Sequence, residues 1–378
     1  MKVVDLKVHL LSAPIDPRYA WKSSLGYSVK RDTVVVEVQT DEGITGYGES
    51  NHALSPTVIA EIIQETLKPL VIGEDPFYVE KIWAKMYKGC RMLGNTGAPV
   101  MAMSGVEIAL WDVVGKALKT PIYKLLGGYR DRIKAYAGGL GLGWKDPDQL
   151  AQEAKVLVQQ GFKALKLRVG RNPKQDLECV SAVRDAVGRD IDIMVDVNGG
   201  YSRRVALDMA RAYQDLGLLW IEEPLPYTDI EGLAELAANV DVSIAGGENV
   251  YTIYGFDQAL RSRALDIVQP DCCKCGGILQ AKKIASMAEA ANLPCAPHIF
   301  GTAIGTAISL QLLGSIPNGL ICEFDVLPDN PLMYELAPGQ LNIQDGFVEI
   351  PQKPGIGIEL NVDAFKKFPF IPGPAYVL

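Results

Sequence analysis

Three acidic residues recur at equal intervals, and each lies at the end of a short apolar run. Asp196 lies in IMVDVN, Glu222 in LLWIEEP and Glu248 in SIAGGEN, so each interval is 26 residues (222 − 196 and 248 − 222). One strand, one helix and two short loops of a parallel β/α unit take up about this length. We therefore expect the three carboxylates on successive strands, converging at one rim. Because Mg²⁺ prefers hard carboxylate and water oxygens, the series predicts a magnesium site.

Two further ionisable residues, Asp271 in LDIVQPD and His298 in LPCAPH, close apolar runs later in the chain. Barrel enzymes carry their catalytic groups at the C-terminal ends of strands, so such positions are candidates for chemistry. A lone histidine at such a point is also compatible with a structural role. A carboxylate on the neighbouring strand, however, can bond one ring nitrogen and raise the basicity of the other. The pair is therefore predicted to form a general acid/base dyad.

Lys166 and Arg168 in KALKLRV and Glu323 in LICEFD supply charges on other runs. Lys166 and Arg168 are two residues apart and point to the same side of a strand, toward the barrel interior. A guanidinium does not deprotonate at useful pH, so Arg168 is expected to act electrostatically rather than as a base. Glu323 can donate a hydrogen bond to a developing oxyanion if carboxylate neighbours raise its pKa. This inventory suits removal of a proton α to a carboxylate, where Mg²⁺ and cations stabilise the added negative charge.

The elements that must carry these residues alternate regularly from Lys134 onward. Eight short apolar runs are separated by amphipathic helical segments; the runs are KAYAGGL, KALKLRV, DIMVDVN, LLWIEEP, VSIAGGEN, LDIVQPD, LPCAPH and LICEFD. This rhythm predicts an α/β fold of the (β/α)₈ barrel type. An open doubly wound sheet is the competing fold, and it is disfavoured because no GxGxxG follows the first strand.

The chain on either side of this region has a different pattern. Residues 1–50 alternate like an antiparallel sheet, with the turn signal DEG at 41–43. Helices are predicted near 56–70, 76–88 and 99–119, the last ending before Pro121. After Asp325 we expect short strands in LNIQDGFVEIP and GIGIELNVDAF that return to the N-terminal part.

Composition limits the classes of function. The net charge of −8 argues against nucleic acid as a partner, because such a protein needs a basic surface. We expect no leader and no membrane span, since no stretch approaches eighteen uncharged apolar residues. The seven cysteines, an odd number, favour reduced thiols and a cytoplasmic location. Cys272, Cys273 and Cys275 lack the paired CxxC form of a zinc site, so packing is their expected role.

Together with the metal series, three segments resemble the enolase superfamily, specifically the mandelate racemase branch of the mandelate racemase/muconate lactonizing enzyme family. They are AMSGVEIALWDVVGKALKTPIYKLLGG (102–128), QPDCCKCGGI (269–278) and APHIFGTAIG (296–305). The resemblance covers almost the whole chain. It implies a modified TIM-type barrel, (β/α)₇β, at 129–328, an α+β capping domain at 1–128 and a segment at 329–378 that returns to the capping domain. It also implies Mg²⁺ as cofactor, a small-molecule carboxylate substrate and a homo-oligomer, from dimer to octamer.

One position departs from the branch. Lys-x-Lys is common at the end of the second strand, with the second lysine as a base, whereas this chain has Lys166-x-Arg168. The resemblance assigns Lys166 and Glu323 to the substrate carboxylate and makes Asp271 and His298 the dyad. With no second base, it favours dehydration of an aldonate or aldarate to a 2-keto-3-deoxy acid. Cycloisomerisation of an aldarolactone and racemisation or epimerisation of a 2-substituted carboxylic acid are the alternatives.

Substrate identity is expected to depend on polar residues around the barrel mouth. The resemblance places Asn198 near the metal. The capping loops at 16–31 and 49–53 add further substrate-binding candidates: Arg18, Tyr19, Lys22, Asn51 and His52. Such groups suit a polyhydroxylated acid, and ordinary solvated loops are the alternative. Trp21 and Tyr27 leave room for a less polar ligand.

Overall fold

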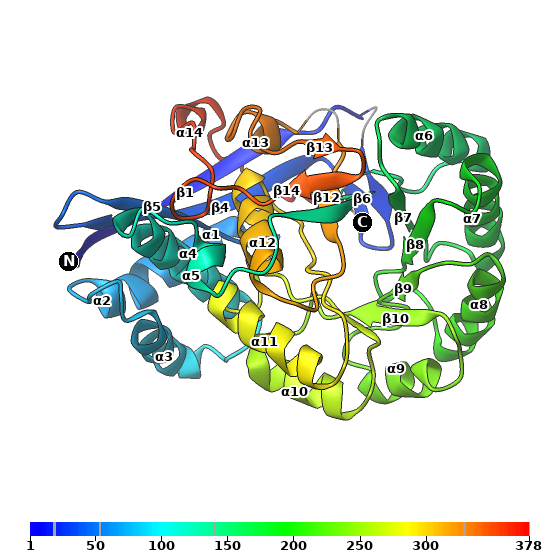
Figure 1. Cartoon of the computed structure of the whole chain (residues 1–378), viewed down its shortest axis with the longest axis horizontal. Coiled ribbons are helices and arrows are strands. Elements are labelled where there is room, and N and C mark those ends of the chain that lie inside the picture. The colour runs from blue at the N-terminus through cyan, green and yellow to red at the C-terminus, as the bar shows by residue number, and fades with distance from the viewer. Residues whose placement is uncertain (18–19, 53, 140, 328–329, 378) are drawn as a thin grey trace.

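The computed structural model describes residues 1–17, 20–52, 54–139, 141–327 and 330–377 (Figure 1). It shows an N-terminal part of sheet and helices beside a ring of parallel strands surrounded by helices (Figure 1). The predicted substrate-binding residues Arg18 and Tyr19 lie outside the described residues.

The parallel strands close into a barrel. They are β6 (Arg132–Gly138), β7 (Ala164–Arg168), β8 (Asp192–Asp196), β9 (Trp220–Glu222), β10 (Ser243–Gly246), β11 (Ile267–Val268) and β12 (Cys322–Asp325). The first six pair in chain order, and β12 pairs with β6. The seventh predicted strand is reduced to bridges from Cys295 to Val268 and Gly319, because Pro294 and Pro297 cannot donate to a ladder. The barrel prediction is confirmed, and the doubly wound sheet is excluded.

Seven helices follow the first seven strand positions and cover the ring (Figure 1): α6 (Pro147–Gln159), α7 (Pro173–Val187), α8 (Arg203–Asp215), α9 (Ile230–Ala237), α10 (Thr252–Arg261), α11 (Ile278–Ala290) and α12 (Ala303–Ser315). α12 is buried along its whole length, whereas the others bury mainly one side. On α8 the buried residues are Ala206, Met209, Ala210 and Tyr213, the spacing of one helix face. β12 is followed instead by the short helix α13 (Pro331–Tyr334). The barrel is therefore of the (β/α)₇β type.

The N-terminal part packs helices against an antiparallel sheet. Its strands are β1 (Val3–Pro14), β4 (Lys30–Thr40) and β5 (Thr45–Ser50), in the order β1-β4-β5. The predicted helix near 56–70 consists of α1 (Pro56–Glu61), a π-helical segment η2 (Ile62–Leu67) and α2 (Lys68–Val71). The other two predicted helices are α3 (Val79–Gly89), continued by the 3₁₀ turn η3 (Cys90–Met92), and α4 (Ala98–Ala117). The short helix α5 (Ile122–Leu125) leads into the barrel.

α4 is the central helix of the N-terminal part. Among the described residues it is the one helix long and apolar enough to cross a membrane, and 89% of that apolar window is buried inside the protein. Its contact with β5 depends on glycine, because a Cβ on Gly48 would lie 2.0 Å from the carbonyl oxygen of Gly105. A Cβ on Gly46 would lie 2.2 Å from the carbonyl oxygen of Ala109. The missing side chains let strand and helix backbones touch.

The last segment of the chain contacts both parts. β13 (Ile343–Gln344) and β14 (Phe347–Glu349) form a hairpin, and β14 pairs with β6 of the barrel. The strand expected at 355–365 is wrong: Gly355 and Gly357 turn the chain with φ of +77° and +91°, and α14 (Ala364–Lys367) follows. β15 (Tyr376–Val377) returns to the N-terminal part, where it pairs with β3 (Gly26–Ser28) beside β2 (Lys22–Ser23). The domain bounds at 128 and 328 stay predictions.

All seven cysteines are free. Six are buried, and Cys179 on α7 is half-buried. Cys272, Cys273 and Cys275 belong to the apolar core, and burial raises the pKa of each of these thiols well above its ordinary value. Their surroundings are those of packed apolar side chains.

Candidate active site

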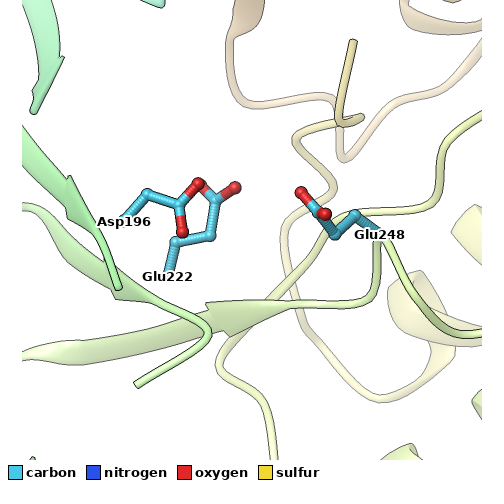
Figure 2. A group of neighbouring side chains, drawn as sticks. All are labelled: Asp196, Glu222 and Glu248. Atoms are coloured by element: carbon cyan, nitrogen blue, oxygen red, sulfur yellow. The ribbon is translucent and has the colours of Figure 1, made fainter. Parts of the chain in front are cut away.

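The equally spaced carboxylates meet at the C-terminal rim of the barrel (Figure 2). Asp196 ends β8 and Glu222 ends β9, where the two are cross-strand partners, and Glu248 follows β10 and faces them. All three are buried, and one oxygen of each lies within 4.8 Å of the others. Oxygens on opposite sides of a Mg²⁺ ion lie about 4.2 Å apart, so small side-chain movements would seat all three on one ion. Among the described residues no other group of His, Cys, Asp or Glu side chains meets this geometry.

Lys166 on β7 is fully buried among carboxylates. Its ammonium donates to Glu222 Oε1 at 2.8 Å and lies 3.0 Å from Glu323 Oε1 and 3.8 Å from Asp196 Oδ2. A buried ammonium without partners costs several kcal/mol, so these carboxylates are what hold Lys166 inside the barrel. The predicted inward cation therefore lies directly beside the metal triad.

Arg168 lies two residues further along β7. Its guanidinium is paired with Asp196 and donates to the carbonyl oxygen of Gly139 at 3.1 Å. It also lies over Trp21, 5.0 Å from the ring centroid. A guanidinium offers N–H donors and no acceptor. The arrangement suits an electrostatic role and supplies no second base on this side of the cavity.

Glu323 on β12 corrects one expectation. The sequence allowed for a protonated Glu323, with a pKa raised by carboxylate neighbours, but its carboxylate faces Lys166 at 3.0 Å and Arg168 at 3.9 Å. The backbone N–H of Ile299 also donates to Oε2 at 3.0 Å. Burial raises the pKa of Glu323, but the charges of Lys166, His298 and Arg168 outweigh burial and lower the pKa to about 2. Glu323 is therefore a charged acceptor, and the condition for a donor role, a pKa raised by carboxylate neighbours, is not met.

His298 and Asp271 form the predicted pair. Asp271 Oδ2 lies 2.8 Å from His298 Nδ1, and its other oxygen accepts a bond from the backbone N–H of Cys273 at 2.7 Å. The second ring nitrogen, Nε2, lies 2.9 Å from Glu248 Oε2. Burial lowers the pKa of His298, but the charge of Glu248 and the bond to Asp271 outweigh it and raise the pKa to about 10. Asp271 thus keeps the proton on Nδ1 and aims Nε2 at the triad.

A cavity of about 610 Å³ adjoins these groups. The predicted substrate-binding residues Asn198, Asn51 and His52 line it, whereas Lys22 is exposed on β2 and is not among its lining residues. Asn198 has a φ of +47°, and its buried side-chain oxygen has no hydrogen-bond partner within the described part of the chain. An unsatisfied buried acceptor costs about 1–3 kcal/mol, which favours a ligand contact for Asn198.

Sequence reasoning missed a polar network beside Glu248. Asn249 donates to Glu223 Oε1 at 2.9 Å and to Glu248 Oε1 at 3.2 Å, and Lys274 donates to Asn249 Oδ1 at 2.9 Å. The network holds the carboxylate of Glu248 in place. Asn249 could have been suspected because it directly follows a metal ligand. No spacing rule predicts that Lys274, in the turn before α11, or Tyr376, on β15, lines the cavity.

Family models match both parts of the chain. Residues 7–127 match the model described as mandelate racemase / muconate lactonizing enzyme, N-terminal domain, and residues 149–364 match the enolase C-terminal domain-like model. The chain belongs to the mandelate racemase / muconate lactonizing enzyme family. As a member of that family it is an enolase-superfamily enzyme with dehydratase or isomerase chemistry, and its buried triad is typical of a divalent-metal site.

Relatives within the family span almost the whole chain. D-galactarolactone cycloisomerase from Agrobacterium fabrum is 34% identical over 380 residues, covering 97% of this chain and 99% of the relative. Arabinonate dehydratase from Saccharolobus solfataricus is 35% identical over 339 residues, covering 89% and 90%. The structure of an enolase-superfamily member from Polaromonas sp. JS666 has a TM-score of 0.95 at 37% identity, covering 100% of both chains. A racemase from Streptomyces coelicolor A3(2) with bound magnesium has a TM-score of 0.89 at 30% identity, covering 97% and 99%.

Proposed function

We propose that this family member is a Mg²⁺-dependent hydro-lyase acting on a sugar acid, an aldonate or an aldarate. It removes the proton α to the carboxylate and eliminates the β-hydroxyl group, giving a 2-keto-3-deoxy acid. The observation that carries the proposal is an oriented base, His298 held by Asp271 at 2.8 Å, beside the buried carboxylate triad. The similarity to arabinonate dehydratase supports the reaction class.

The positive charges of the site stabilise negative charge on the substrate. When bound to Asp196, Glu222 and Glu248, Mg²⁺ supplies positive charge to the substrate carboxylate and makes the α-proton more acidic. Lys166, buried next to the triad, adds a second positive charge where negative charge develops as the proton leaves. Arg168 adds a third cation on the same side.

His298 carries both proton transfers. Nε2 takes the α-proton while Asp271 holds the ring by Nδ1, and the protonated imidazole then gives the proton to the departing β-hydroxyl, which leaves as water. The charge of Glu248 is the largest of the effects that raise the pKa of His298 against burial, and the bond to Asp271 adds to it. A cation held by Glu248 would neutralise its charge and so lower the pKa of His298 toward the range of a general base.

A lactone cycloisomerase is the second candidate. D-galactarolactone cycloisomerase is 34% identical to the chain, and Trp21, Phe300 and Tyr376 give the cavity an aromatic wall that suits a ring. Both reactions begin with loss of the α-proton to one base and differ in the group that leaves from the β-position. A racemase would need a base on each face of the substrate, and the pairing of Arg168 disfavours one.

His298→Asn tests the proposal. We expect turnover to fall by about 10²–10⁴-fold or more, while circular dichroism stays unchanged and titration calorimetry still detects Mg²⁺ binding. The substrate is found by incubating the wild-type protein and Mg²⁺ with mono- and diacid sugars and detecting 2-keto products with semicarbazide, with lactones assayed in parallel. Substantial residual turnover in His298→Asn would remove His298 from the base role. Activity with a lactone alone would favour the cycloisomerase, and α-deuterium incorporation in both configurations from D₂O would identify a racemase.

A further inference from the structure

The β2–β3 hairpin lies against the metal-bearing rim of the barrel. Ser24 donates its hydroxyl to the carbonyl oxygens of Val197 at 3.1 Å and Asn198 at 3.3 Å, directly after the end of β8. Trp21, which leads into the hairpin, and Leu25 at its turn both line the catalytic cavity. The hairpin is therefore a wall of the site.

β15 is the outer partner of this hairpin. It pairs with β3 in the register Tyr376 to Ser28 and Val377 to Tyr27, in a sheet of order β15-β3-β2. The backbone N–H of Val29 donates to the carbonyl oxygen of Ala375 at 2.9 Å. Successive side chains of a strand point to opposite faces. Accordingly, Tyr376 lines the cavity, while Val377 and its cross-strand partner Tyr27 are 37% and 39% exposed.

Tyr376 forms one aromatic cluster with Trp21 and Phe300. The ring centroids lie 5.9 Å apart for Trp21 and Tyr376, 6.4 Å for Trp21 and Phe300, and 6.5 Å for Phe300 and Tyr376. All three rings line the cavity that contains His298, and Phe300 stacks on His298 at 6.4 Å. Ring surfaces of this size favour C–H groups and bury them without a hydrogen-bond requirement.

The cations of the cavity are already engaged. Apart from the catalytic base, the described lining residues include two cations, Arg168, which is paired with Asp196, and Lys274, which donates to Asn249. His52 is neutral, because burial and, to a smaller extent, nearby cations lower its pKa to about 3. Among the described lining residues a second substrate carboxylate would meet no unpaired cation, and a buried charge without a partner is unfavourable.

We propose that Tyr376 is a specificity-determining residue, whose ring, together with Trp21 and Phe300, selects acids with uncharged distal carbons, so that a monocarboxylate binds in preference to a dicarboxylate. The inference rests on the proposed function, because it places the reacting carboxylate at the metal triad. The pairing of β15 with β3 holds the ring of Tyr376 in the wall.

Three small acids distinguish binding at the metal triad from binding at the aromatic wall. Oxalate has no carbons beyond its two carboxylates, whereas racemic 2-hydroxyvalerate and 2-hydroxyglutarate share a five-carbon chain and differ in a distal methyl or carboxylate group. Calorimetry on the Mg²⁺-loaded protein is expected to show 2-hydroxyvalerate bound about tenfold more tightly than 2-hydroxyglutarate. Tyr376→Ala should weaken 2-hydroxyvalerate about tenfold and leave oxalate within about twofold, as expected for the loss of buried ring surface. Tyr376→Phe should behave as wild type.

Tyr27→Ala is the matched control, a tyrosine of the same small sheet that does not line the cavity. It should leave all three affinities within about twofold. Equal binding of the two five-carbon acids by the wild type, or equal losses for oxalate and 2-hydroxyvalerate in Tyr376→Ala, would overturn the specificity role. Failure of oxalate to bind the wild type would count against the metal-centred function instead. The comparison of the two five-carbon acids would still measure the selectivity of the aromatic wall.

Deleting residues 375–378 should speed hydrogen exchange at the backbone N–H of Val29, because this removes its acceptor on β15. Unchanged exchange would contradict the role of β15.

Discussion

His298 meets a carboxylate at each ring nitrogen, Asp271 at 2.8 Å and Glu248 at 2.9 Å. Its pKa of about 10 in the folded protein lies above the ordinary value of 6.5. A group whose pKa is raised by folding contributes its full stabilisation below the unfolded pKa and loses it as the pH rises through the folded pKa. The metal-free protein should therefore become less stable as the pH rises from about 6.5 to about 10.

Urea unfolding in EDTA measures this loss. Between pH 6.5 and pH 10 we expect the free energy of unfolding of the wild type to fall by on the order of 3 kcal/mol more than that of His298→Asn. The variant serves as the control because it lacks the titrating ring but keeps every other ionisable group. Identical pH dependence of the two proteins would contradict the pairing of His298 with both carboxylates.

Lys274 contacts the metal site in two ways: it donates to Asn249, and its ammonium lies 3.9 Å from Glu248 Oε1. Lys274→Met removes the ammonium that holds the amide of Asn249 toward Glu248, so Mg²⁺ affinity should fall by about 10–100-fold, as is usual for a group that orients a metal ligand. Titration of the metal-free protein with Mg²⁺ measures this. Lys283→Met is the control, since Lys283 lies on α11, which follows the turn that carries Lys274, and pairs at the surface with Glu80 at 2.6 Å. Unchanged Mg²⁺ affinity in Lys274→Met would show that Asn249 orients Glu248 without help.

For single residues, the sequence predicts where a side chain lies better than whether that side chain is charged. Asp196, Glu222 and Glu248 each lie at or just after the end of a strand. Because the carboxyl ends of parallel strands lie at one rim of the barrel, this position alone predicts that the three side chains meet. The charge of Glu323 depends instead on Lys166, which is distant in the chain and lies on β7, on the other side of β6 from β12. No local pattern contains that contact.

Among the elements, β5 and α4 lie backbone against backbone at glycine positions. Gly48→Ala should lower the free energy of unfolding by about 1–3 kcal/mol, because its Cβ would meet the carbonyl oxygen of Gly105 at 2.0 Å and force the two elements apart. Gly43→Ala is the comparison: a Cβ there meets nothing within 4 Å, so only the strain of its φ of +77° remains. Denaturant midpoints measure both changes. A Gly48→Ala variant as stable as Gly43→Ala would show that the helix shifts freely.

Strands and helices could be predicted from the sequence where the apolar runs were long, or where a short run lay between two helical segments. The run around Cys295 was correctly placed, but its two prolines leave it as isolated bridges rather than a strand. The segment 355–365 has the alternation of a strand, yet its glycines adopt positive φ and turn it. In both cases residues with special backbone requirements outweighed the hydrophobic pattern.

At the scale of the whole molecule, the N-terminal part holds the loop that follows His298. Glu49 on β5 accepts bonds from the backbone N–H of Thr302 at 3.1 Å and of Gly305 at 2.8 Å, at the start of α12. Arg31 on β4 donates to the carbonyl oxygen of Gly301 at 2.8 Å. These contacts join residues more than 250 positions apart, so only the folded chain reveals them. The homo-oligomer stays a prediction, which sedimentation analysis would measure.

The burial of the thiols makes this chain selectively addressable by covalent reagents. Six cysteines are inside the protein, whereas Cys179 on the outer helix α7 reaches solvent in part. The thiolate is the reactive form, and burial raises the pKa of Cys179. A maleimide dye or spin label added to the native enzyme should therefore attach at one place, slowly at neutral pH and faster as the pH rises, without removal of any native cysteine.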